Sequence, residues 1–174
     1  MNIILVGYRA AGKSTIGKEL ATKLNFNFYD VDRFIEPRIT PKTLSEFYLE
    51  VGEEGFRPLE TEIVLDLCNR PQSVISLGAG SLMRKKNQQA AKKNAQIIYI
   101  KVPAKDLWSR IQLDPNSKKT RPNLAGGGFK EVETMLKIRE PDYLSCSNLI
   151  VDGTMPISEL VEQIILFCQS NLRI

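Results

Sequence analysis

The sequence Gly7-Tyr8-Arg9-Ala10-Ala11-Gly12-Lys13-Ser14 fits the pattern G-x-x-x-x-G-K-[ST] and directly follows the apolar run Ile3-Ile4-Leu5-Val6. A strand that turns sharply into a helix aims backbone N–H groups at a bound phosphate, and the glycines let the backbone come close. In this pattern Lys13 reaches the β- and γ-phosphates, and the Ser14 hydroxyl binds the Mg²⁺ that bridges them. Apolar side chains then recur at helical spacing, at Ile16, Leu20 and Leu24. The stretch therefore predicts a phosphate-binding loop between a strand and a helix.

Composition limits the class of protein. With 174 residues, 43% of them apolar, we expect one domain over residues 1–174. No run approaches the ~20 apolar residues that span a bilayer, and the chain opens on a strand and not on a signal segment, so we expect a cytoplasmic protein without membrane contact.

The counts of cysteine, histidine and charged residues limit the chemistry. The three cysteines lack metal-like spacing and are expected to be reduced thiols: Cys68, Cys146 and Cys168. With no histidine, proton transfer must rest with carboxylates, lysines or water. The net charge of +4 fits a nucleotide or a nucleic acid without choosing between them.

Short β-rich runs alternate with helix-like segments along the whole chain. They are nearly continuous in apolar residues, as expected when helices cover both faces of a parallel sheet. This order predicts an α/β fold, a doubly wound five-stranded parallel sheet flanked by helices, of the P-loop NTPase or nucleoside-monophosphate-kinase type. Ligands then gather at the carboxyl ends of the strands. The runs are Asn2–Val6, Phe28–Asp32, Ser73–Leu77, Ile97–Val102 and Asn148–Asp152.

A pair of carboxylates stands at the end of the second predicted strand. Alternation along a strand predicts that Asp30 and Asp32 lie on the same side, near the strand's carboxyl end. One could hold Mg²⁺ through water, while the other accepts a hydrogen bond from a substrate hydroxyl and orients it for in-line attack. The alternative is a strand end capped by solvated aspartates.

Two polar segments have less certain roles. The run Asp114–Gly128 is rich in Gly, Pro and positive charge, which predicts a mobile lid over about residues 112–128, with a solvated insertion as the alternative. Arg84-Lys85-Lys86 and Lys92-Lys93 lie on a polar helical stretch. We expect a solvated face there, with nucleic-acid contact as the second possibility.

The class of P-loop protein follows from what else the sequence holds. It contains neither the N-K-x-D nor the D-x-x-G pattern of a regulatory GTPase. The remaining fit is a small-molecule kinase, in which catalysis is mainly positioning and charge neutralisation by arginines and a lid. Arg57, Arg121 and Arg139 are the candidates.

At this point the sequence resembles the shikimate kinase family over nearly its whole length. Each motif alone is weak, but their order and spacing together are specific. The matching motifs are Gly12-Lys13-Ser14-Thr15, Asp30-x-Asp32, Gly52-Glu53-x-x-Phe56-Arg57-x-x-Glu60, Leu77-Gly78-Ala79-Gly80, Thr120-Arg121-Pro122-x-Leu124 and Arg139-x-x-x-Tyr143.

The resemblance implies transfer of the ATP γ-phosphoryl group to the 3-hydroxyl of shikimate, with Mg²⁺, by a monomer that binds no nucleic acid. It assigns catalysis to Lys13, Asp32 and Arg121, and metal binding to Ser14 and Asp30. Shikimate would be bound by Asp32, Arg57, Ala79, Gly80 and Arg139. The nucleotide would be bound by Gly7, Ala10, Ala11, Gly12, Lys13, Ser14, Thr15, Arg110, Arg121 and Pro156.

The sequence departs from the family pattern at three positions and in the lid. Ala10 and Ala79 replace glycines, which is harmless at negative φ and unfavourable at positive φ. Tyr48 stands where a phenylalanine usually lines the substrate pocket, and the lid is longer than in many relatives. Two other functions remain open: a related kinase for gluconate or a nucleoside monophosphate, and a nucleotide- or nucleic-acid-binding module without kinase turnover.

Overall fold

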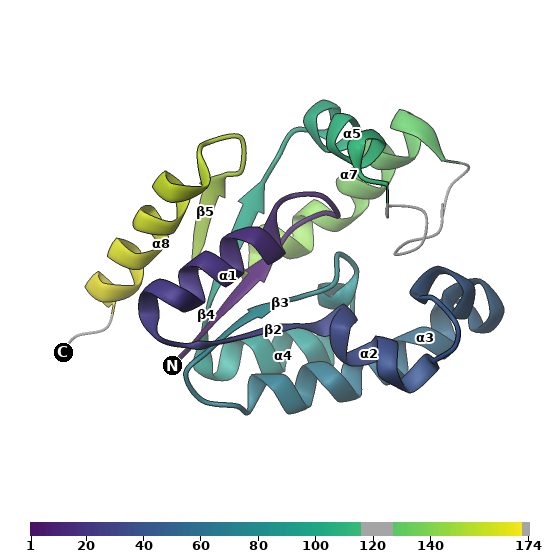
Figure 1. Ribbon diagram of the computed structural model, residues 1–174, viewed down its shortest axis with the longest axis horizontal. Helices are drawn as coiled ribbons and strands as arrows, with labels where there is room; N and C mark the ends of the chain where they lie inside the picture. Colours follow the sequence, from purple (N-terminus) through teal and green to yellow (C-terminus); the bar gives the residue numbers. More distant parts are fainter. Residues whose placement is uncertain (116–126, 172–174) are drawn as a thin grey trace.

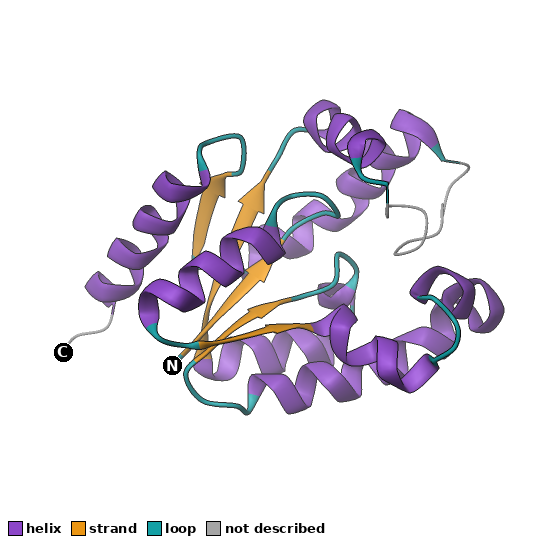
Figure 2. Cartoon of the chain, viewed as in Figure 1, coloured by secondary structure: helices purple, strands orange, loops and turns teal. Residues whose placement is uncertain are grey.

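The computed structural model describes residues 1–115 and 127–171, and all strands in this part belong to one parallel sheet (Figures 1 and 2). The strands are β1 (Asn2–Val6), β2 (Asn27–Asp30), β3 (Ser73–Ser76), β4 (Ala95–Lys101) and β5 (Leu149–Asp152). Their order in the sheet is β2-β3-β1-β4-β5, with every pairing parallel. The predicted five-stranded doubly wound sheet is confirmed.

Helices join the strands and cover both faces of the sheet. They are α1 (Lys13–Leu24), α2 (Val31–Ile39), α3 (Leu44–Cys68), α4 (Lys85–Asn94), α5 (Ala104–Leu113), α7 (Gly128–Cys146) and α8 (Ile157–Asn171), with a short 3₁₀ turn η1 (Ser81–Met83). Ile3 and Leu5 of β1 are buried in a core with α1, α5 and α8, whereas Ile4 and Val6 are buried in a second core with α2, α3 and α4. Successive residues of a strand point to opposite faces, so β1 joins both cores.

The second strand ends two residues earlier than the sequence pattern predicts. Asp30 has extended backbone angles and is the N-cap of α2, where its Oδ1 accepts a hydrogen bond from the N–H of Asp32 at 3.1 Å. An aspartate at this position satisfies a free N–H of the first helical turn. Asp32 therefore lies in a helix, and the prediction that strand alternation places Asp30 and Asp32 together was wrong in its geometry.

Helix α3 begins with a capping box and bends in its first half. The Thr43 hydroxyl accepts from the N–H of Glu46, and the Glu46 carboxylate accepts from the N–H of Thr43. Gly52 has φ 69° and ψ −179°, which interrupts the helical backbone five residues before Arg57. The bend places the second part of α3 along the sheet, where Phe56 and Glu60 are fully buried.

The predicted lid lies largely outside the described residues. Helix α5 ends at Leu113 and α7 begins at Gly128, while residues 116–126, which include Arg121, fall in the part of the chain that the structure does not describe. Among residues 1–115 and 127–171, no helix has both the length and the apolar character needed to cross a membrane.

Candidate active site

The loop after β1 has the backbone of a phosphate-binding loop. Gly12 is the N-cap of α1 in the left-handed conformation, with φ 96°, and no side chain caps the helix. The N–H groups of this first turn and the helix dipole together favour an anion. The Lys13 ammonium curls back over the loop and donates to the carbonyls of Gly7 and Tyr8, both at 2.9 Å. The predicted phosphate-binding residues thus form the loop after β1 and the first turn of α1: Gly7, Ala10, Ala11, Gly12, Lys13, Ser14 and Thr15.

A cavity of about 250 Å³ opens beside this loop at the carboxyl ends of the strands. Six predicted site residues line it: Ala10, Lys13, Ser14, Asp30, Asp32 and Ala79. Residues from the loop after β1, the end of β2 and the loop after β3 therefore meet here, as the topology of a parallel α/β sheet predicts.

The Ser14 hydroxyl and the Asp30 carboxylate are in direct contact. Ser14 donates a hydrogen bond to Oδ2 of Asp30 at 2.5 Å, and Asp32, in the first turn of α2, lines the same cavity. A hydroxyl and a carboxylate are hard oxygen donors of the kind that Mg²⁺ takes together with substrate phosphates. Within the described residues, no group of three or more acidic or thiol side chains is arranged to hold a metal ion by itself. The oxygen pair therefore fits a Mg²⁺ that arrives with a nucleotide.

Arg57 is held in a buried ion-pair network on α3. Its side chain is 4% exposed; Nη1 donates to Glu60 at 2.6 Å, while Nε and Nη2 donate to Glu53 at 3.1 and 3.0 Å. Glu60 is fully buried and also accepts from the Ser81 hydroxyl at 2.8 Å. Burial by itself would lower the pKa of Arg57, but the charges and hydrogen bonds of Glu60 and Glu53 outweigh it and raise the pKa. The guanidinium is therefore a fixed cation.

Arg57 also lies against the loop after β3. A Cβ atom built on Gly80 would lie 2.1 Å from Nη2 of Arg57, so only glycine admits the guanidinium here. Tyr48 is half-buried, and its ring packs against that of Phe56, the residue before Arg57, at a tilt of 56° with centroids 5.2 Å apart. The structure thus brings Arg57 and Gly80 together, although neither lines the 250 Å³ cavity itself.

Arg139 approaches the site from α7. It is 8% exposed, and its guanidinium carbon lies 5.6 Å from the ring centroid of Tyr8 in the phosphate-binding loop. Burial raises the pKa of the Tyr8 hydroxyl, an effect that the charges of Arg139 and Arg9 partly offset. Arg139 therefore lies next to Tyr8 of the loop and does not line the cavity.

The two alanines that replace family glycines differ in backbone conformation. Ala10 has φ 61°, in the left-handed region that disfavours a Cβ, whereas Ala79 is not among the described non-glycine residues with positive φ. Ala79 is 5% exposed, and its carbonyl accepts a hydrogen bond from the Tyr143 hydroxyl. The backbone at Ala10 is therefore strained by its Cβ, whereas the backbone at Ala79 is not.

Two further predicted nucleotide-binding residues, Arg110 and Pro156, come from elements later in the chain. Arg110 of α5 donates from Nη2 to the Gly153 carbonyl at 2.8 Å, and from Nη1 to the carbonyls of Ala10 and Ala11 at 3.4 Å each. Pro156 is exposed just before α8. Arg110 thus fastens the turn between β5 and α8 to the phosphate-binding loop. The remaining predicted residue, Arg121, is outside the described residues.

Arg9 is a site residue that the sequence did not single out. It lines the cavity, its side chain is 15% exposed, and it lies 3.7 Å from the buried carboxylate of Glu131. Its Nε is buried and, within the described part of the chain, has no hydrogen-bond partner. In the G-x-x-x-x-G-K-[ST] pattern Arg9 occupies an unspecified position, so only its place in the fold identifies it.

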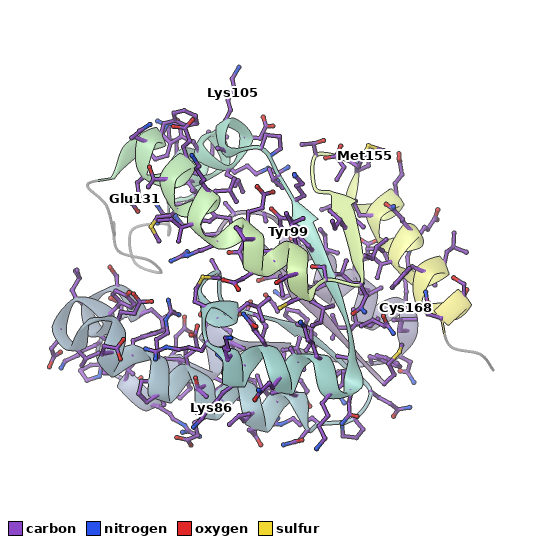
Figure 3. All side chains as sticks on the ribbon, turned by 180° about the vertical axis from the view of Figure 1, so that it is seen from behind. Lys86, Tyr99, Lys105, Glu131, Met155 and Cys168 are labelled. Atoms are coloured by element: carbon purple, nitrogen blue, oxygen red, sulfur yellow. The ribbon has the colours of Figure 1, made fainter. Side chains whose placement is uncertain are left out.

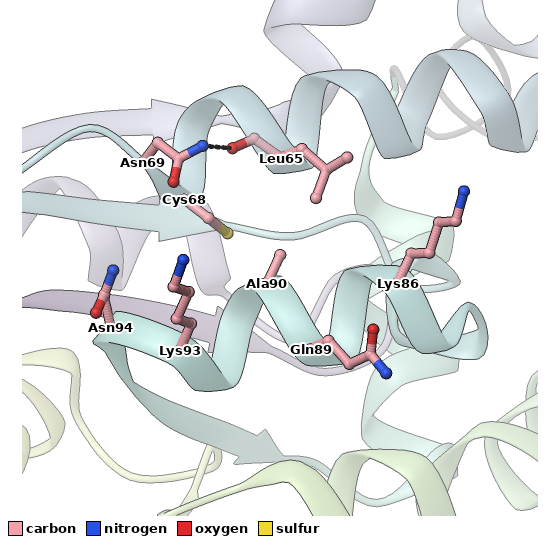
Figure 4. Close-up of a pocket in the computed structure, with 8 residues that line it drawn as sticks. All are labelled: Leu65, Cys68, Asn69, Lys86, Gln89, Ala90, Lys93 and Asn94. Atoms are coloured by element: carbon pink, nitrogen blue, oxygen red, sulfur yellow. Dashed lines mark hydrogen bonds between the residues drawn. The ribbon is translucent and has the colours of Figure 1, made fainter.

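A second hollow lies between α3 and α4, away from this site (Figure 4). The lysines Lys86 and Lys93 of α4 border it and are exposed, and Asn69 at the end of α3 donates to the Leu65 carbonyl at 3.0 Å. The exposure of these lysines fits the predicted solvated face.

Comparison with known proteins identifies the family. The family model described as shikimate kinase matches residues 9–169. The chain is 32% identical to a shikimate kinase of Burkholderia lata, covering 95% of this chain and 88% of that protein, and 34% identical to shikimate kinase 2 of Yersinia enterocolitica, covering 94% and 92%. Its fold matches the solved structure of shikimate kinase from Acinetobacter baumannii in complex with shikimate, with a TM-score of 0.89 and 30% identity, covering 99% of this chain and 95% of that chain. The chain therefore belongs to the shikimate kinase family.

Proposed function

We propose that this protein transfers the γ-phosphoryl group of ATP to the 3-hydroxyl of shikimate and releases shikimate 3-phosphate and ADP, a step toward chorismate and the aromatic amino acids. The observation that carries the proposal is the cavity in which Lys13 and Ser14 of the phosphate-binding loop face Asp30 and Asp32. A phosphate donor site and an acceptor site must adjoin for phosphoryl transfer, and the meeting of the loop with Asp32 and Ala79 in one cavity supports this arrangement.

The nucleotide side of the site is the loop from Gly7 to Thr15. Its N–H groups would surround the phosphates, and Lys13 would exchange its bonds to the loop carbonyls for the β- and γ-phosphate oxygens. Arg110, which already joins this loop to the turn before Pro156, would border the adenine. Arg121, by the family resemblance, would reach the phosphates from the lid.

Ser14 and Asp30 would hold Mg²⁺, Ser14 directly and Asp30 through water. When bound, the ion neutralises the charge of the β- and γ-phosphates. Asp30 also caps α2, so the carboxylate is held in place by the N–H of Asp32 before any ligand arrives.

Asp32 would accept a hydrogen bond from the 3-hydroxyl of shikimate and orient its oxygen toward the γ-phosphorus. Its position in the first turn of α2 places it on a rigid element beside the loop. Since the transition state of phosphoryl transfer is loose, this orientation supplies much of the catalysis whether or not the proton moves early.

Arg57 and Arg139 would bind the shikimate carboxylate, next to the backbone of Ala79 and Gly80. Glu60 is fully buried and keeps its bond to Nη1 of Arg57, whereas the Glu53 side chain is 54% exposed and free to swing outward. We infer that the substrate carboxylate replaces Glu53 at Nε and Nη2, the edge that can meet a carboxylate with two parallel bonds.

The test is ADP release from Mg-ATP by the purified protein with shikimate, gluconate, a nucleoside monophosphate or no acceptor. Release that depends on shikimate alone supports the proposal. Release only with gluconate or the monophosphate would reassign the acceptor, and release with none would favour a binding module. Salt-sensitive binding of DNA or RNA with an affinity comparable to that of ATP would point the same way.

We also propose that the protein works as a monomer in the cytoplasm. Its cysteines, Cys68, Cys146 and Cys168, are buried free thiols, which suits a reducing compartment. Sedimentation velocity would test the oligomeric state, and fractionation of cells that produce the protein would test the location.

A further inference from the structure

The motif Arg139-x-x-x-Tyr143 contains a tyrosine that the proposed mechanism does not use. Tyr143 is 1% exposed, and its hydroxyl donates a hydrogen bond of 2.5 Å to the carbonyl oxygen of Ala79. Residues four apart on a helix share a face, so α7 carries Arg139 and Tyr143 on one side. The helix that supplies a substrate arginine therefore also holds the loop after β3.

The hydrogen bond from Tyr143 sets the direction of one peptide group. The peptide between Ala79 and Gly80 is trans, so its C=O and its N–H point in opposite directions. Because the hydroxyl holds the carbonyl toward α7, the N–H of Gly80 faces away from α7. The Arg57 guanidinium packs against the same glycine, so a turn of this peptide would also disturb Arg57.

We propose that Tyr143 is a positioning residue for the acceptor site, whose hydroxyl fixes the Ala79–Gly80 peptide in its substrate-binding orientation. The inference rests on the proposed function, because it takes the backbone of Ala79 and Gly80 as part of the shikimate site. Without the hydroxyl, the buried carbonyl loses its partner, and a rotation that exposes it to solvent would turn the Gly80 N–H the wrong way.

A neighbouring tyrosine offers a matched control. Tyr99 of β4, labelled in Figure 3, is also 1% exposed. Its ring centroid lies 5.1 Å from that of Tyr143. Its hydroxyl donates to Glu140 at 3.1 Å, and Glu140 pairs with Lys101 at 3.0 Å, so this hydroxyl does not hold the loop after β3. Loss of either hydroxyl leaves the same aromatic packing.

The experiment compares Tyr143→Phe with Tyr99→Phe in steady-state kinetics. Tyr143→Phe should raise the KM for shikimate roughly three- to tenfold, the range expected for one hydrogen bond, and leave the KM for ATP unchanged. Tyr99→Phe should leave both values unchanged. A KM for shikimate that stays at the wild-type value in Tyr143→Phe, or rises equally in both variants, would overturn the proposal.

Amide hydrogen exchange provides a measurement that does not depend on turnover. The Ser81 N–H of the wild-type protein, which donates to the Gly78 carbonyl at 3.0 Å, should be protected from exchange. Tyr143→Phe should accelerate its exchange, while Tyr99→Phe should not. If Tyr143→Phe fails to fold, wild-type exchange decides: slow exchange at Ser81 supports the proposal, and fast exchange overturns it. Wild-type protein that is inactive with shikimate but protected at Ser81 would overturn the proposed function and keep the anchoring role.

Discussion

The Ser14 hydroxyl donates a hydrogen bond of 2.5 Å to Oδ2 of Asp30, which joins the start of α1 to the end of β2. Sixteen residues separate the two in the sequence, yet both lie at the carboxyl edge of the sheet, where β1 and β2 flank β3. The proposed Mg²⁺ site at Ser14 and Asp30 can therefore be tested separately from the proposed shikimate site.

Asp30→Asn should raise the Mg²⁺ concentration needed for half-maximal activity. Removing one charge from a water-mediated partner of the ion weakens metal affinity by about 10- to 100-fold. Mg²⁺ titration of ADP release measures the effect, and Asp32→Asn is the control, because it should lower kcat without moving the Mg²⁺ midpoint. Equal shifts of the midpoint in both variants would contradict the division of roles.

Lys13→Ala should reduce kcat by about a hundred- to a thousandfold, since a fixed cation at the transferred group is lost. The matched control is Lys18→Ala, an exposed lysine of the same helix that should have no effect. Thermal melting of both variants shows whether loss of the bonds to Gly7 and Tyr8 unfolds the loop's surroundings. Turnover at the wild-type rate in Lys13→Ala would refute the assignment of the site.

Arg139→Ala should mainly raise the KM for shikimate. A charge-assisted hydrogen bond is worth about 1.5–3 kcal/mol, which corresponds to roughly a 10- to 100-fold change. Arg139→Lys should recover only part of the loss, because an ammonium lacks the planar fork of the guanidinium. The measurement is initial rate against shikimate concentration at saturating ATP, and an unchanged KM would remove Arg139 from the acceptor site.

Glu60→Ala should destabilise the fold by about 3 kcal/mol, because among the described residues it leaves buried Arg57 with the half-exposed Glu53 as its remaining ion-pair partner. For a chain of this size that lowers Tm by about 6–12 °C. The control is Glu62→Ala, on the same helix as Glu60. It removes an exposed ion pair with Arg38 of α2 and should change stability by less than about 0.5 kcal/mol. Calorimetry separates the two; equal melting points would show that the buried pair is dispensable.

Ala10→Gly should stabilise the protein. Removing the Cβ at φ 61° relieves about 1–2 kcal/mol of backbone strain in the folded state. The greater conformational freedom of glycine in the unfolded chain offsets about 0.4–1 kcal/mol of this gain. Ala11→Gly is the control: Ala11 is buried and is not among the residues with positive φ, so the same change should destabilise. Urea unfolding of both variants gives the sign, and a loss of stability in Ala10→Gly would show that the alanine is unstrained.

Much of the fold was predictable because its signals are local. Each strand is a short apolar run, and five such runs alternating with helical segments leave few topologies other than a parallel sheet with helices on both faces. The loop from Gly7 to Ser14 was predictable for the same reason, since its glycines, lysine and serine act through neighbouring backbone. The end of β2 was not predictable in this way. The alternation of side chains through Asp32 suggested a continuing strand, whereas Asp30 is the N-cap of a helix that begins at Val31.

By itself, the sequence determined the fold class, the phosphate-binding loop and the family, since these depend on order and spacing along the chain. The tertiary structure decided which charged side chains are buried in ion pairs and which line the cavity. Arg57 forms ion pairs with buried Glu60 and exposed Glu53, and the Tyr143 hydroxyl donates to the carbonyl of a residue 64 positions away. Arg9 lines the cavity, and within residues 1–115 and 127–171 its buried Nε has no hydrogen-bond partner. Burial and partner choice are properties of groups that meet only after the chain folds, and no local pattern encodes them.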